Sequence, residues 1–109
     1  MMTNSYLVYT TETLDKEVLK LSKDEQERID GLYKQLKKNP YVGDQLRYKH
    51  FREKRLREKR IYYLVYDHLH SVLLVTIGGK KDQQATIDHI IDYFDEYQIY
   101  LEKLIKNNN

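Results

Sequence analysis

The sequence predicts a single α+β domain in which helices cover a small sheet. Three observations support this class: a short strand pattern near the start, apolar residues at helical spacing in the first third and last quarter, and two adjacent strand-like runs between them. The chain has 109 residues, one proline and four glycines. This length and composition indicate one domain (1–109) with short connections.

The first third is predicted to be a strand followed by a helical hairpin. The run "SYLVYT" (5–10) is rich in β-branched and aromatic residues, as strands are. Leu14, Val18 and Leu21 then recur at helical spacing behind a threonine-rich start.

The second helix of this hairpin carries a start signal and a stop signal. Ser22 and Glu25 have the spacing of a capping box, in which each side chain pairs with the other's backbone amide. The helix is expected to end at Asn39, because the residue before Pro40 is pushed out of the helical conformation.

The middle of the chain is predicted to be an antiparallel meander. "KRLRE" (54–58) and "RIYYLVYD" (60–67) are almost contiguous, which indicates a tight hairpin near Arg57 to Lys59. "DHLH" (67–70) makes the next turn, and "SVLLVTI" (71–77) is apolar on both faces, as an interior strand is. Gly78 and Gly79 are expected to end that strand.

Residues 83–105 are predicted to form one long C-terminal helix. At 1.5 Å per residue its length is about 35 Å, which exceeds what a small sheet can cover. We therefore expect its apolar end to project beyond the sheet, where it offers a surface for a homodimer. The apolar positions that follow the helical period are Ile87, Ile90, Ile91, Phe94, Tyr97, Leu101 and Leu104.

Charge is distributed unevenly along the chain. Between Leu46 and Arg60 there are eight Lys or Arg residues and two Glu residues, a net charge of +6. From Asp82 to Glu102 there are six acidic residues and no Lys or Arg, a net charge of −6. The basic segment favours a polyanion or an acidic protein as partner, although such a run is also typical of a solvated surface.

Strand alternation is expected to place much of this charge on one side of the sheet. If Ile61, Tyr63 and Val65 face the helices, the opposite face carries basic and aromatic side chains. Arginine binds phosphate oxygens in bidentate fashion and tyrosine stacks on unpaired bases, so this face could bind single-stranded RNA. The residues predicted for this face and its edges are Tyr48, Lys49, Arg52, Arg55, Arg57, Arg60, Tyr62, Tyr66, Lys80 and Lys81.

Other classes of site have little support. The absence of cysteine excludes disulfides and thiol nucleophiles and fits a reducing cytosol, so we expect a cytoplasmic protein. The first ten residues lack the pattern of a signal peptide, and the longest apolar run is too short to span a membrane. His68 and His70 have no evident third metal ligand, whereas His50 within the basic run could act as a general acid or base.

The order and motifs of these elements resemble the RelE/ParE superfamily of toxins. The resemblance rests on "KKNPYVGDQL" (37–46) at the end of the helical hairpin, "KRLREKRIYYLVY" (54–66) and "VLLVTIGGKK" (72–81). It implies a RelE-like fold with a core at about 5–90 and a C-terminal helix extension at about 83–106. It further implies the toxin of a type II toxin–antitoxin module, a ribosome-dependent and metal-independent mRNA endoribonuclease that inhibits translation.

The resemblance also implies site residues and partners. Arg60 corresponds to the arginine that opens the family's penultimate strand, Arg55 and Arg57 to arginines of the strand before, and Lys81 to the basic residue after the last strand. The expected catalytic residues are Arg60, with Arg57 and Lys81 beside it, which stabilise the charge on the phosphate. Lys54 or His50 is the expected general base for attack by the RNA 2′-hydroxyl, without a cofactor. The expected partners are mRNA on the ribosome and a small acidic antitoxin.

Two departures from the family pattern keep an alternative open. The hairpin between Arg57 and Arg60 is short and lacks the family's glycine, and "DQQATIDH" (82–89) lacks the tyrosine or histidine expected after the basic corner, offering only His89 one turn later. The alternative is a non-catalytic interaction module, either a gyrase-type inhibitor or an inactive relative that binds an antitoxin or RNA.

Overall fold

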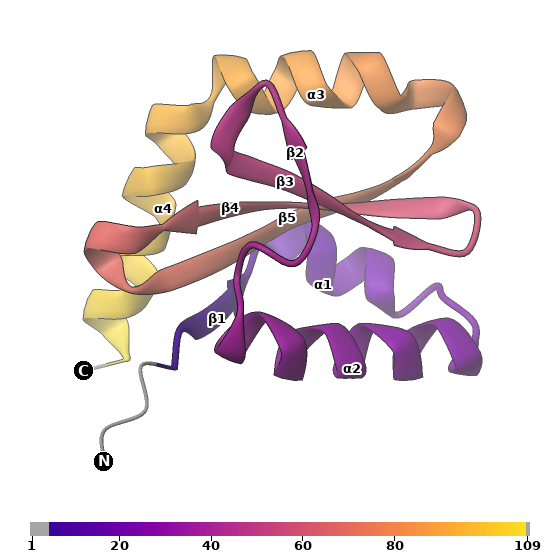
Figure 1. The fold of residues 1–109 in the computed structure, drawn as a ribbon, viewed down its shortest axis with the longest axis horizontal. Helices are drawn as coiled ribbons and strands as arrows, with labels where there is room; N and C mark the ends of the chain where they lie inside the picture. Colours follow the sequence, from indigo (N-terminus) through magenta and orange to yellow (C-terminus); the bar gives the residue numbers. More distant parts are fainter. Residues whose placement is uncertain (1–4, 109) are drawn as a thin grey trace.

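The computed structural model describes residues 5–108, which form a five-stranded mixed sheet between two layers of helices (Figure 1). The strand order is β1-β5-β4-β3-β2. The strands are β1 (Leu7–Thr10), β2 (Asp44–Leu46), β3 (Tyr48–Leu56), β4 (Lys59–Tyr66) and β5 (Ser71–Gly79). The helices are α1 (Glu12–Val18), α2 (Lys23–Lys38), α3 (Gln83–Asp92) and α4 (Phe94–Asn107), with 3-10 turns at Asp67–Leu69 and Lys80–Asp82.

The predicted helix signals are confirmed. The Thr11 hydroxyl accepts a hydrogen bond from the Leu14 amide at the start of α1. Ser22 and Glu25 form the complete capping box of α2, and Asn39 ends that helix in an extended conformation. None of the helices formed by residues 5–108 has the length and apolarity that a bilayer crossing requires.

The strand β5 is held in place along both of its edges. Antiparallel β4 lies on one side, and β1 pairs in parallel on the other side as far as Thr10 opposite Leu74. Beyond Leu74, Glu17 of α1 pairs with this edge of β5 in place of a strand. Its carboxylate accepts hydrogen bonds from the Thr76 hydroxyl at 2.8 Å and the Ile77 amide at 3.0 Å. The end of β5 that leads to Lys80 is therefore fixed by helix α1.

The predicted β3–β4 hairpin is confirmed, with Leu56 opposite Lys59 and a two-residue connection of Arg57 and Glu58. Two details differ from expectation. The strand β5 continues through Gly78 to Gly79, since these residues pair with Arg60 and Lys59 of β4, and so it ends two residues later than expected. The short edge strand β2 was not predicted, because three residues interrupted by a register shift carry too little alternation to be recognised.

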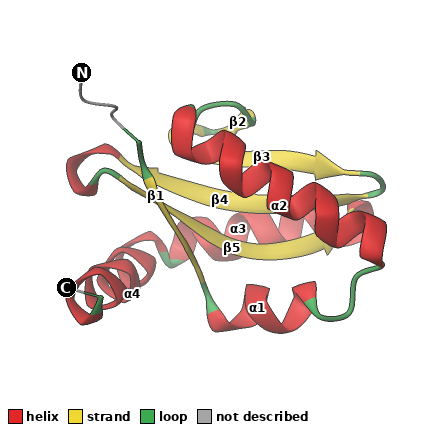
Figure 2. Cartoon of the chain, turned by 90° about the horizontal axis from the view of Figure 1, so that it is seen from below, coloured by secondary structure: helices red, strands yellow, loops and turns green. Residues whose placement is uncertain are grey.

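The sheet has an apolar core on each face. The core beneath α1 and α2 includes Leu32, Leu36, Leu56, Ile61, Tyr63 and Val65. The core beneath α3 and α4 includes Phe51, Tyr62, Leu64, Tyr66, Ile90 and Leu101. The alternation along β4 is as expected, but the prediction that the second face is open is wrong. Helix α3 lies behind the strands in Figure 2, and side chains of α3 and α4 pack on this face.

The C-terminal segment is not one long helix. The helical backbone conformation is broken at Tyr93, which has a φ of −113° and a ψ of 21°, and α4 turns away from the direction of α3 (Figure 1). The bend brings Leu101 into full burial and packs Leu104 and Ile105 against the second core. Burial of such side chains is worth more than the one or two backbone hydrogen bonds a bend disturbs. The projecting apolar end expected for a homodimer is absent.

Candidate nucleic-acid interface

A groove with four basic residues lies where the β3–β4 hairpin meets the end of β5. Its volume is about 470 Å³, and its lining residues are Arg55, Glu58, Lys59, Gly79, Lys80 and Lys81. We call this the cationic groove. The pairing of Lys59 with Gly79 and of Arg55 with Arg60 brings the three segments together. Two of the predicted RNA-binding residues, Arg55 and Lys80, thus lie beside the predicted catalytic residue Lys81.

Arg60 lies next to the groove but is nearly buried. Its Nε donates to Oε2 of Glu53 over 2.9 Å, and the two side chains are 12% and 11% exposed. Gln83, the first residue of α3, donates to the other Glu53 oxygen over 2.9 Å. This carboxylate fixes the guanidinium and offsets its charge. One terminal nitrogen of Arg60 is buried and has no hydrogen-bond partner among residues 5–108.

Arg57 does not face the cationic groove. Its φ of 56° places it in the left-handed region at the hairpin turn, and its side chain forms an ion pair with Asp24 at the start of α2. Hydrogen bonds from Arg57 and Arg28 hold the pKa of the Asp24 carboxyl below its usual value. The structure therefore separates Arg57 from Arg60.

The two predicted general bases lie elsewhere. Lys54 pairs with Ile61 and lines a different hollow, together with Arg28 and Leu32 of α2, on the opposite side of the sheet from Glu53. His50 is near the other end of β3, with its ring 4.6 Å from that of Phe94. Burial lowers the pKa of His50. Neither residue joins the cationic groove.

The remaining predicted contacts fall into two groups. Lys49 and Arg52 lie over the ring of Tyr41, each 5.2 Å from its centroid, near the end of β3 that is remote from the hairpin. Tyr62 and Tyr66 are 0% and 5% exposed, so the prediction that their rings face outward is wrong. Both hydroxyls are buried, and neither has a hydrogen-bond partner in the part of the chain that the structure describes.

Three residues near the site were missed. Lys59 lies within the basic run, and Glu53 shares a strand face with Arg55, so charge and alternation could have indicated both. Gln83 had no such signal, because its contact with Glu53 depends on where α3 docks. Within residues 5–108, no group of three or more His, Asp or Glu side chains is arranged to hold a metal ion.

The cationic groove can bind an anion with several oxygens. Four basic side chains line a shallow hollow, of which Lys59 is paired with Glu25 at 3.5 Å, and lysine and arginine are the side chains that contact phosphate. No histidine or tyrosine is among its lining residues in the part of the chain that the structure describes. Glu58 is the one carboxylate of that lining, so proton transfer there would use Glu58 or a lysine.

Comparison with known proteins identifies the fold. No family model and no curated protein matches the sequence. A free double mutant of the Escherichia coli RelE toxin superposes with a TM-score of 0.65 at 18% identity, covering 79% of this chain and 98% of that one. The chain has a RelE-like fold.

Two solved toxin–antitoxin complexes show the same likeness. The intact E. coli RelBE complex matches with a TM-score of 0.62 at 20% identity, covering 69% of this chain and 96% of the matched chain. The RelE–RelB complex of Pyrococcus horikoshii matches with a TM-score of 0.64 at 18% identity, covering 72% and 97%.

Proposed function

We propose that this chain is the toxin of a type II toxin–antitoxin module and that it inhibits translation by cleaving mRNA on the ribosome. The observation that carries the proposal is the cationic groove, located at the hairpin of a RelE-like fold. Solved chains of the same fold are described as toxins in complex with antitoxins. The four basic residues of the groove suit both an RNA backbone and an acidic antitoxin segment.

The chemistry we propose uses the nucleophile that RNA itself supplies. Attack by a 2′-hydroxyl builds negative charge on the non-bridging phosphate oxygens, and cations already held in position there stabilise the transition state. Arg55, Lys80 and Lys81 would hold the phosphate, and the neighbouring Arg60 would join them by exchanging Glu53 for the phosphate. Glu58 would accept the proton of the nucleophile, and Lys81 would protonate the leaving 5′-oxygen. The products would end in 2′,3′-cyclic or 3′-phosphate.

A second candidate function is supported by the positions of the predicted catalytic residues, several of which lie far from the groove. His50, Lys54 and Arg57 lie outside the cationic groove, and the charge of Arg60 is offset by Glu53. A non-catalytic relative, which binds RNA or an antitoxin without cleaving RNA, would tolerate this arrangement.

Induction in a bacterial host separates these functions. The toxin should stop protein synthesis, and mRNA isolated from the cells should carry new ends with cyclic or 3′-phosphate termini. Changing both Lys80 and Lys81 to Ala should abolish the arrest. The matched control changes Lys103 and Lys106 of α4 to Ala, because these lysines are also exposed but lie outside the groove. Arrest without new RNA ends would favour the non-catalytic function.

Salt dependence tests the RNA contact directly. Each phosphate neutralised on a single strand contributes about 0.7 to the slope of log affinity against log salt concentration. Removal of Lys80 and Lys81 should therefore lower the slope by about 1.4, whereas removal of Lys103 and Lys106 should leave it unchanged. An affinity insensitive to salt would contradict the proposed RNA contact.

A further inference from the structure

A second hollow, of about 420 Å³, lies at the end of the sheet opposite the cationic groove. Side chains from β3, β4, the following 3-10 turn and the loop before β2 line it. The lining side chains include Tyr41, Tyr48, Lys49, His50, Tyr66 and His68. This volume is within the range of small-molecule sites in proteins. We call it the aromatic hollow.

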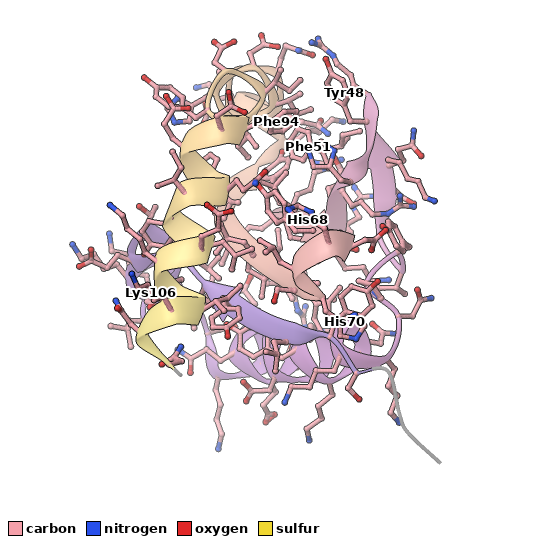
Figure 3. All side chains as sticks on the ribbon, turned by 90° about the vertical axis from the view of Figure 1, so that its left-hand side faces the viewer. Tyr48, Phe51, His68, His70, Phe94 and Lys106 are labelled. Carbon is pink, nitrogen blue, oxygen red and sulfur yellow. The ribbon has the colours of Figure 1, made fainter. Side chains whose placement is uncertain are left out.

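The aromatic rings of this hollow are held by their neighbours. The Tyr48 ring packs edge-on against Phe94 of α4 at 5.3 Å, yet the residue is 47% exposed. His50 lies 4.6 Å from the same Phe94 ring, and His68 lies 6.1 Å from Tyr66. In Figure 3, Tyr48 and Phe94 lie near the upper end of α4, and His68 lies below them. Because these rings are already ordered, a ligand that stacks on them loses little binding energy to ordering.

Basic side chains border one side of the aromatic hollow. The Lys49 ammonium and the Arg52 guanidinium both lie over the Tyr41 ring. Neither makes an ion pair with an acidic residue in the described part of the chain. Lys49 lines the hollow, so its charge is available to an incoming phosphate, whereas the Arg52 guanidinium lies outside the lining and donates to the carbonyl oxygens of Gly43 and Lys49.

A carboxylate lies beside the same Tyr41 ring, and it suits the polar edge of a base better than a phosphate. The Asp67 carboxylate accepts hydrogen bonds from the hydroxyls of Tyr6 and Tyr41 at 2.7 and 2.6 Å, and Gln98 of α4 lies on the same hollow. A carboxylate repels phosphate but can accept a hydrogen bond from an amino group of a base. The buried Tyr66 hydroxyl, which has no partner, belongs to the same lining.

We propose that the aromatic hollow binds one unpaired nucleobase of a single-stranded RNA, with the adjoining phosphate on Lys49. This inference rests on the proposed function. Lys49 and Arg55 are six residues apart on β3, a separation of roughly 20 Å along the strand. An RNA held in the cationic groove would therefore reach the aromatic hollow several nucleotides away, so that β3 carries two contacts with one strand.

The test uses binding of single-stranded RNA of about 12 nucleotides in which one abasic position is moved along the strand. At one position, loss of the base should weaken binding to the full chain about tenfold, as expected for one stacked base. Tyr48→Ala should bind the intact RNA about tenfold more weakly and no longer distinguish it from the abasic RNA. Tyr48→Phe, which keeps the ring, should behave like the unchanged protein.

Two controls separate stacking from other effects. Tyr93→Ala removes a tyrosine that is 44% exposed at the bend between α3 and α4, and it should preserve the discrimination. Lys49→Ala should weaken binding of both RNAs equally. Two results would show that the aromatic hollow is not a base site: no abasic position weakens binding, or Tyr48→Ala still binds intact RNA more tightly than abasic RNA. If binding nevertheless depends on Lys80 and Lys81, the proposed function stands. If no RNA binds, both proposals are overturned.

Discussion

Glu53 accepts a hydrogen bond from Arg60 over 2.9 Å in a nearly buried pair, with Gln83 of α3 on its second oxygen. This carboxylate gives Arg60 a fixed orientation and also offsets its charge. An anion that enters the cationic groove must therefore compete with Glu53 for this guanidinium, because the terminal nitrogen that lacks a partner is buried. The contact with Gln83 links the position of α3 to the arginine on which the proposed chemistry depends.

Removing one member of this pair should destabilise the protein strongly. Arg60→Ala leaves the Glu53 carboxylate nearly buried without its counter-charge, and such a change costs about 3–5 kcal/mol in the free energy of unfolding. The double variant with Glu53→Ala should be less destabilised than the sum of the single changes, with a coupling of about 1–3 kcal/mol. Urea unfolding of the four proteins measures this coupling, and additive effects would contradict a coupled pair.

Two glycines should respond in opposite directions to alanine. A Cβ on Gly43 would lie 2.5 Å from the Glu53 carbonyl oxygen and 2.7 Å from the Tyr63 hydroxyl, so Gly43→Ala should cost about 1–3 kcal/mol of stability. A Cβ on Gly31 would meet no atom within 4 Å, on the exposed side of α2. Gly31→Ala should therefore stabilise the protein by about 1 kcal/mol through helix propensity. Thermal unfolding of both variants distinguishes the two effects.

Two buried tyrosines should also differ when their hydroxyl is removed. The Tyr63 hydroxyl accepts a hydrogen bond from the Gly43 amide at 2.9 Å, so Tyr63→Phe leaves a buried amide unpaired at a cost of about 1–3 kcal/mol. The Tyr66 hydroxyl is buried without a partner, so Tyr66→Phe should be neutral or stabilising by about 1 kcal/mol. Equal losses in denaturant unfolding would show that the Tyr66 hydroxyl does have a partner.

Stability should fall on mild acidification because of His50. Burial against Phe94, Tyr48 and Tyr66 lowers the pKa of His50 below its value in the unfolded chain. At acidic pH the unfolded chain therefore binds a proton at His50 more readily than the folded chain does, which favours unfolding. This contribution is complete above about pH 6.5 and is lost as the pH falls from there through the folded pKa.

A variant isolates this effect. His50→Gln has no group that titrates at this position, so the difference in unfolding free energy between the two proteins should change between about pH 7.5 and pH 5. Hydrogen bonds from Tyr41 and Tyr6 lower the pKa of the Asp67 carboxyl, and its contribution is lost only in more acidic solution. A constant difference across this range would mean that His50 is not desolvated in the folded protein.

The sequence by itself determined the features whose signals are local. The capping box of Ser22 and Glu25, the stop at Asn39 and the tight turn after Leu56 each depend on a few neighbouring residues, and each is present. The alternation of Ile61 and its neighbours likewise follows from backbone geometry alone.

Only the tertiary structure decided what covers the second face of the sheet. The helical period of residues 83–105 is the same for a straight helix and for one bent at Tyr93, and only packing on the sheet selects the bend that buries Tyr62 and Tyr66. The tertiary structure also decided that the neighbouring basic residues between Leu46 and Arg60 lie at different sites. Strand alternation directs Lys54 to one face of the sheet, and the left-handed turn at Arg57 directs that side chain to Asp24. The docking of α3 fixes the Glu53 carboxylate that holds Arg60.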